Sequence, residues 1–196
     1  SESVRSMGGI LVNAEGKRFC NDMSTRDAVS NAELEQPGAY AYIIFDQRIV
    51  DDLKSCQKYI SNGLTVSSDS YEGLAKEMGL TGDAAANFVE TMNTWNASVA
   101  AGKDAEFGRS NGMDGDLSTA PYYAIKIAPG IHHTMGGLKI NTDAQVLDTD
   151  GSIIPGLYAA GETTGGVHGG NRIGGNAVCD FVVFGRIAGA SAAAAA

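Results

Sequence analysis

The segment 169–177, Gly-Gly-Asn-Arg-Ile-Gly-Gly-Asn-Ala, constrains the fold more than any other part of the chain. An apolar run at 157–160 precedes it and predicts a buried strand, and an apolar stretch at 177–190 follows it and predicts a helix. A strand, a glycine-rich turn and a helix N-terminus form an anion site, because backbone N–H groups and the helix dipole point the same way. Arg172, in the middle of the turn, is suited to bind a carboxylate bidentately.

This turn differs from the usual dinucleotide-binding fingerprint. Its glycine spacing does not fit G-x-G-x-x-G, and no acidic residue follows about 20 positions later. A glycine loop that only lets a helix pack against a sheet is therefore the structural alternative. The rest of the chain has to decide between the two readings.

Composition narrows the function classes. A length of 196 residues suits one large domain or two small ones. A net charge of −9 argues against nucleic acid as a partner, because such a chain cannot neutralise a run of phosphates. A membrane span needs roughly 18–20 apolar residues in a row. No apolar stretch of the sequence reaches that length, so we expect no membrane span. The chain does not begin with Met and starts close to a strand-like run at 9–12, so we expect a piece of a longer protein.

The cysteines and histidines predict no metal site. Three cysteines lie far apart without a C-x-x-C pair, so buried free thiols are expected at Cys20, Cys56 and Cys179. The histidines are too few and badly spaced for zinc without help from carboxylates.

The hydrophobic patterns predict a mixed α+β fold. A hairpin is expected from strands at 9–12 and 13–19 around a glycine turn, and a central strand at 41–45. The helices are expected at 46–56, at 70–78 with Ser70 as N-cap, and at 83–100 with Thr81 or Asp83 as cap. A loop at 103–117, a strand at 122–127 and a hairpin of 137–140 with 145–147 complete the pattern.

Four polar clusters carry candidate chemistry: Ser1-Glu2-x-x-Arg5, Ser24-Thr25-Arg26-Asp27, the segment 132–137 (His-His-Thr-Met-Gly-Gly), and the 169–177 motif with Glu162 and His168 beside it. Each has an ordinary explanation, such as a solvated helix start or a surface ion pair. Together, arginine and histidine side chains flanked by Gly-Gly pairs favour close approach of the backbone to a ligand, and they suit a carboxylate.

In order and spacing, this set resembles the soluble fumarate reductase flavoproteins, within the wider succinate dehydrogenase and fumarate reductase flavin-subunit family. The motifs that carry the resemblance are the four clusters, 16–19 (Gly-Lys-Arg-Phe) and 159–162 (Ala-Ala-Gly-Glu), and they extend over essentially the whole chain. The resemblance implies a capping domain of mixed strands and helices plus the C-terminal strand–loop–helix part of a Rossmann-like FAD-binding domain. It implies a border segment at 1–26, the cap at 27–125 and the C-terminal FAD-domain piece at 126–196.

The resemblance also implies residue roles. Arg26 matches the arginine that gives a proton to the substrate, and Glu2 and Arg5 match the relay that reprotonates it. The matched substrate-binding residues are Ser1, His132 and Arg172. On the FAD side the matched residues are His133, Gly161, Glu162, Asn176, Ala177 and Val178. The N-terminal half of the FAD site and one further substrate histidine belong to a piece that this chain does not contain.

The implied reaction is reduction of an α,β-unsaturated carboxylate, most simply fumarate to succinate, by hydride from flavin N5 and a proton from Arg26. The implied partners are a small unsaturated acid and an electron donor outside this segment. The alternatives are reduction of urocanate or an aryl acrylate, flavin-dependent dehydrogenation of a ketosteroid, and a ligand-binding module without turnover. The compartment does not follow from the sequence, although an exported bacterial protein is favoured over a cytoplasmic one.

Overall fold

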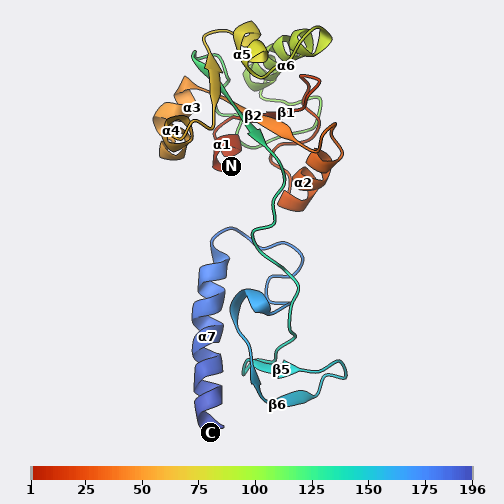
Figure 1. Ribbon diagram of the computed structural model, residues 1–196, viewed down its shortest axis with the longest axis vertical. Helices are drawn as coiled ribbons and strands as arrows, with labels where there is room; N and C mark the ends of the chain where they lie inside the picture. Colours follow the sequence, from red (N-terminus) through yellow and green to blue (C-terminus); the bar gives the residue numbers. More distant parts are fainter. Residues whose placement is uncertain (1, 196) are drawn as a thin grey trace. The chain divides into compact units, whose positions relative to one another are not determined.

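The structure, a computed structural model, describes residues 2–195 and forms two compact units (Figure 1). Unit 1 extends to Pro129 and unit 2 begins at Gly130. Ser1, one of the expected substrate-binding residues, lies outside the described residues. The mixed α+β class predicted from the sequence is confirmed.

A four-stranded antiparallel sheet forms the centre of unit 1. Its strands are β1 (Ile10–Val12), β2 (Ala41–Asp46), β3 (Val66–Ser68) and β4 (Tyr122–Ile127), in the order β1-β2-β4-β3. Every residue of β2 is buried, because this apolar strand has a neighbour on each side and is covered on both faces. The central strand and the strand at 122–127 are thus where the sequence predicts them.

The described part of unit 1 also contains the helices α1 (Glu2–Ser6), α2 (Arg26–Leu34), α3 (Gln47–Asp52), α4 (Lys54–Ser61), α5 (Tyr71–Glu77) and α6 (Asp83–Ala100). Phe88, Met92 and Trp95 form one fully buried stripe along α6, as the helical spacing predicts. Helix α5 packs on α6 and on strands β3 and β4 (Figure 1). The Ser70 side chain caps α5 by accepting a hydrogen bond from the Gly73 N–H at 3.1 Å, as expected.

Three local predictions in unit 1 are wrong. The segment 13–19 is not a strand: β1 pairs with β2, and the chain after Asn13 makes a turn that packs against α6. The predicted helix at 46–56 is broken at Leu53, whose extended backbone separates α3 from α4. The N-cap of α6 is Gly82, without a side-chain bond, so neither Thr81 nor Asp83 caps it.

Unit 2 consists of a short antiparallel pair, β5 (Gln145–Leu147) and β6 (Ile153–Tyr158), a 3₁₀ turn η1 (Gly161–Thr163), and the long helix α7 (Asn176–Ala194). Within the described part of this unit, the buried apolar residues are Ala144, Val146 and Ala159. The strand predicted at 157–160 is present only as the end of β6, at 157–158, and it is not buried: of these four residues Ala159 alone is buried. Unit 2 therefore has elements without a sizeable core of its own.

Helix α7 is long and apolar enough to cross a membrane by length and composition, with a mean hydropathy of 1.5. The sequence prediction that no segment reaches this length missed it. A single such helix is weak evidence for a membrane span, because the interior helix of a larger soluble domain has the same composition. The free thiols vary: Cys56 is buried, Cys20 is half-buried and Cys179 is exposed.

Candidate functional site

Two of the predicted catalytic residues contact each other in unit 1. Arg26 opens helix α2 and Glu2 opens helix α1. The Arg26 Nε and Nη2 atoms both donate to Oε2 of Glu2, at 3.1 and 2.9 Å. The side chains are 34% and 57% exposed, so this ion pair is open on one side. A guanidinium with a carboxylate at hydrogen-bond distance is an arrangement through which a proton can pass.

Arg5 lies one helical turn after Glu2 on the same short helix. Its Nη1 donates to the main-chain oxygen of Asp22 at 2.6 Å. The three residues that the resemblance groups as proton donor and relay thus come from two helices of unit 1: Glu2 and Arg5 from α1, and Arg26 from α2.

Beneath α1 lies a buried group of charged residues, the arginine–aspartate cluster, which consists of Arg18, Asp22, Asp104 and Arg109. Arg18 donates to Asp22 Oδ2 at 2.8 Å and to both carboxylate oxygens of Asp104, at 3.1 and 2.9 Å. Arg109 donates to the same Asp22 oxygen at 3.2 Å. All four side chains are at most 1% exposed.

The charges of this cluster are matched to one another. Both guanidinium groups lie over the ring of Trp95, with their Cζ atoms 4.8 Å (Arg18) and 4.5 Å (Arg109) from its centroid. Burial opposes ionisation of Asp104, but the hydrogen bond and charge of Arg18 lower the pKa of Asp104 to about 2. The carboxylate therefore stays charged at any physiological pH. Sequence patterns alone carry no signal for this cluster, because it joins residues 86 positions apart.

Glu33 is a further buried carboxyl group that the sequence did not single out. It lies on α2 and is 5% exposed. Burial raises the pKa of Glu33, and the positive charge of Arg5 partly opposes that rise. Glu33 and Arg26 are seven positions apart on one helix, so both lie on similar faces of α2.

In unit 2, two residues predicted separately for the FAD side, His133 and Glu162, lie next to each other. His133 Nδ1 is 3.5 Å from Glu162 Oε2, and the other Glu162 oxygen accepts the N–H of Thr134 at 2.9 Å. The His133 ring meets the His168 ring edge-on, with centroids 5.8 Å apart. His168 Nε2 in turn lies 3.0 Å from Oδ2 of Asp180, a buried residue of α7 that the sequence did not single out.

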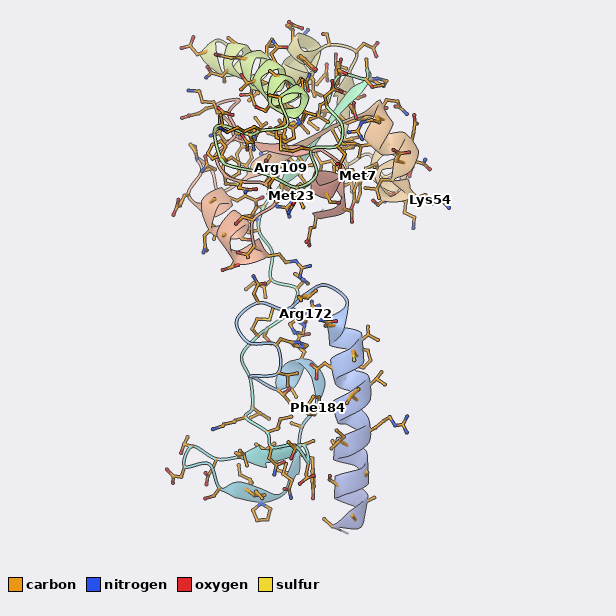
Figure 2. All side chains as sticks on the ribbon, turned by 180° about the vertical axis from the view of Figure 1, so that it is seen from behind. Met7, Met23, Lys54, Arg109, Arg172 and Phe184 are labelled. Carbon is orange, nitrogen blue, oxygen red and sulfur yellow. The ribbon has the colours of Figure 1, made fainter. Side chains whose placement is uncertain are left out.

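Two of the three predicted substrate-binding residues, His132 and Arg172, lie on loops of unit 2. His132 is exposed. Arg172 is 8% exposed and lies in the glycine-rich loop before α7, where its Nη1 donates to the neighbouring Ile173 oxygen at 3.3 Å (Figure 2). The loop enters the helix through Gly175, whose φ of 87° is in the left-handed region that favours glycine. The predicted strand–glycine loop–helix order is therefore present.

At the start of α7, the helix dipole is available to a ligand, whereas some of the backbone N–H groups are already hydrogen-bonded. The N–H groups of Asn176 and Val178 donate to the main-chain oxygens of Ile173 and Gly175, at 3.3 and 3.2 Å. Gly161 packs closely on this helix, because a Cβ at Gly161 would lie 3.1 Å from Cβ of Phe181. The helix N-terminus thus still favours negative charge nearby, but two of its N–H groups are already used.

A cavity of about 330 Å³ adjoins the start of α7, lined by Val167, His168, Asn176, Cys179, Asp180, Val183 and Phe184. Phe184 lies on the third turn of α7 (Figure 2). It also lines a second cavity of about 550 Å³, next to Gly165 and Gly166. Among residues 2–195, the buried Oδ1 of Asp180 has no hydrogen-bond partner. Cavities lined mainly by apolar side chains with a few polar groups are typical of ligand sites.

Comparison with known proteins identifies the family. Residues 1–178 match the family model described as the FAD binding domain. A probable fumarate reductase of Shewanella frigidimarina is 50% identical over 193 residues, which cover 98% of this chain and 32% of the relative. A urocanate reductase of Eggerthella lenta is 41% identical over 191 residues, which cover 95% of this chain and 31% of the relative.

A solved structure agrees with these relatives. The open conformation of a flavocytochrome c3 fumarate reductase superposes with a TM-score of 0.80 at 49% identity, covering 100% of this chain and 34% of that one. The chain spans about a third of the length of the relatives that it matches. By its motifs, its fold and its sequence identity, the chain belongs to the family of FAD-binding domains that includes the fumarate reductase flavoproteins.

Proposed function

We propose that this chain is part of an FAD-dependent oxidoreductase that reduces an α,β-unsaturated carboxylate, most simply fumarate to succinate. The observation that carries the proposal is the Arg26–Glu2 contact of 2.9 Å. Arg26 is bonded to Glu2, and Glu2 lies one helical turn from Arg5, so the three groups form a chain that can exchange protons. A purely structural ion pair on the surface would not need the third group. Reductase relatives at 50% and 41% identity support the same reaction class.

We further propose that residues 27–125 are the capping domain, 126–196 the C-terminal piece of the FAD-binding domain, and 1–26 the border segment. Support for a larger FAD-binding domain comes from unit 2 itself. Its exposed apolar side chains include Leu138, Ile153, Leu157, Val178, Phe181, Val182 and Val183. Such an apolar surface is normally covered by other parts of a protein.

The residues of unit 2 fit part of an FAD site. The cavity at the start of α7, with the unpartnered buried oxygen of Asp180, has room and polarity for part of a ligand. We assign His133, Gly161, Glu162 and the start of α7 at 176–178 to the flavin side. The dipole of α7 would favour negative charge on a reduced flavin ring. When bound, FAD supplies the hydride that reaches one alkene carbon.

The chain's own residues would then hold the acid and move the proton. His132 and Arg172 are proposed to bind one carboxylate, with Arg172 offering two parallel N–H donors. Arg26 gives a proton to the second alkene carbon. Glu2, bonded to Arg26, returns a proton to it, and Arg5 supplies Glu2. Immediate reprotonation makes an arginine acceptable as a proton donor, because its neutral form never accumulates.

The relatives favour two substrate classes. A probable fumarate reductase is 50% identical to the chain, whereas a urocanate reductase is 41% identical. An arginine and a histidine assigned to one carboxylate suit a small diacid, so fumarate is the first proposal and urocanate the second. The electron donor and the exported location expected from the sequence stay predictions.

The test is anaerobic reoxidation of reduced methyl viologen by the full-length protein that contains this chain. Fumarate, urocanate and an aryl acrylate are compared side by side. Rapid oxidation with fumarate alone supports the diacid reading, whereas oxidation only with another acid moves the proposal to that substrate. Arg26→Lys keeps the positive charge and should abolish reduction while the protein stays yellow with FAD. Reduction at an unchanged rate by this variant would exclude Arg26 as the proton donor.

A further inference from the structure

The short helix α1 carries two relay residues of the proposed reaction, yet little in its own sequence holds it in place. It has five residues, and a helix of that length is not stable alone in water. Val4 is its one buried side chain. The direction of Glu2 and Arg5 must therefore be set by contacts from outside the helix.

Arg109 supplies the main contact. All five of its N–H donors are used: Nε donates to Asn111 O at 2.9 Å, Nη1 to Gly9 O at 2.8 Å and to Asp22, and Nη2 to Gly112 O and Arg5 O at 2.6 Å each. Its side chain is 0% exposed and lies in the interior of unit 1 (Figure 2). Arg109 therefore ties the C-terminal end of α1 to the loop around residues 109–112.

Asp22 holds the same helix through the Arg5 side chain. Its main-chain oxygen accepts Nη1 of Arg5 at 2.6 Å, while its carboxylate accepts from Arg109 at 3.2 Å and from the Leu11 N–H at 2.6 Å. Arg109 thus donates a hydrogen bond to the main chain of Arg5, and Asp22 accepts one from the Arg5 guanidinium. Arg109 and Asp22 are also bonded to each other. The main chain and the guanidinium of Arg5 are thus bonded to two residues that form one buried ion pair.

We propose that Arg109 and Asp22 are positioning residues for proton transfer, because they fix where Arg5 and, through α1, Glu2 meet Arg26. This inference rests on the proposed reductase function. Neither residue touches the acid or the reacting atoms. Their effect is geometric, since a displacement of about 1 Å in a reacting constellation costs on the order of 100-fold in rate.

Arg18 provides a matched control inside the same cluster. It is as buried as Arg109, bonds to the same Asp22 oxygen and lies over the same Trp95 ring. Its hydrogen bonds go to Asp22 and Asp104, and among the described residues none of them reaches α1. Loss of the Arg18 guanidinium therefore disturbs the arginine–aspartate cluster but leaves the hydrogen bonds that hold α1 intact.

The experiment compares Arg109→Lys with Arg18→Lys in the full-length flavoprotein. Each variant is assayed for flavin absorbance, Tm, kcat and KM with fumarate, and the solvent deuterium isotope effect on kcat. We expect Arg109→Lys to lower kcat between 10- and 100-fold and to raise the isotope effect, with KM within about twofold. Arg18→Lys should lower Tm by a similar amount and keep kcat within about twofold.

Equal losses of kcat in the two variants, or an unchanged isotope effect in Arg109→Lys, would overturn the proposal. If Arg109→Lys fails to bind flavin, Asp22→Asn and its control Asp104→Asn are subjected to the same assays, and the same contrast between them decides. Failure of the underlying function is distinguishable, because the unmodified protein would then reduce no unsaturated acid or would be unaffected by Arg26→Lys.

Discussion

Arg26 and Glu2 are 24 positions apart in the chain, and both the Nε and Nη2 atoms of Arg26 donate to one oxygen of Glu2. The geometry leaves the carboxylate bonded to the proposed donor and within one helical turn of Arg5. This relationship makes the relay testable one residue at a time.

Glu2→Gln should lower kcat in the full-length protein about 100-fold or more, because an amide keeps the hydrogen bond to Arg26 but cannot carry a proton. KM for the acid should change little, since Glu2 is not proposed to touch substrate. Steady-state kinetics with reduced methyl viologen measure both constants. The control is Glu72→Gln, on the exposed first turn of α5. A kcat within twofold of the unmodified enzyme would remove Glu2 from the relay.

Glu33→Gln should raise the thermal stability of the chain at pH 7 by a few degrees. Burial raises the pKa of Glu33, so the folded state binds the proton more tightly than the unfolded state, whose pKa is about 4.3. The resulting stability is present below that pH and is lost as the pH rises through the folded pKa. Glutamine imitates the protonated form, so its advantage should shrink from pH 7 to pH 4.

Melting curves of both forms from pH 4 to pH 8 measure this difference. Glu35→Gln is the matched control, because Glu35 is exposed just after the same helix. A lower Tm for Glu33→Gln at pH 7 would mean that attraction to Arg5 outweighs the cost of burial.

Gly16→Ala should destabilise the chain by roughly 2–5 kcal/mol, because two costs add. The φ of Gly16 is +77°, and a Cβ there would collide with the main-chain oxygen of Ala84 on α6. Gly63→Ala separates the two costs: its φ is +68°, but nothing lies within 4 Å of the new Cβ. Urea unfolding should show a loss of roughly 1–2 kcal/mol for Gly63→Ala. Equal losses would show that the turn at 13–17 can move away from α6.

Asp180→Asn should raise KM for the acid about tenfold and leave kcat within twofold. The Asp180–His168 contact of 3.0 Å joins α7 to the start of the loop that carries Arg172. A hydrogen bond to a charged group contributes about 1.5–3 kcal/mol, and about 1.4 kcal/mol is a tenfold change in binding. Saturation kinetics of the full-length enzyme check it, with Ser191→Ala near the far end of α7 as control. A fall in kcat at constant KM would place Asp180 in the chemical step instead.

Periodic and capped elements could be predicted from the sequence because their determinants are local. The buried stripe of Phe88, Met92 and Trp95 follows from helical spacing, and the Ser70 cap from one hydroxyl three residues before a free N–H. The glycine-rich loop followed by a helix is likewise present before α7. The motifs also pointed to a family of FAD-binding proteins, which the comparisons confirm.

Other features were decided by the tertiary structure. The partner of β1 is β2 rather than the segment after the glycine turn, because the longer apolar strand buries more surface. The arginine–aspartate cluster depends on contacts 86 and 87 residues apart, which no local pattern encodes. The sequence by itself determined helices α5, α6 and α7, the central strand and, through the family resemblance, the candidate relay residues. Only the folded chain buries Asp22 and Arg109 under α1, where we propose that they hold the candidate relay residues in position.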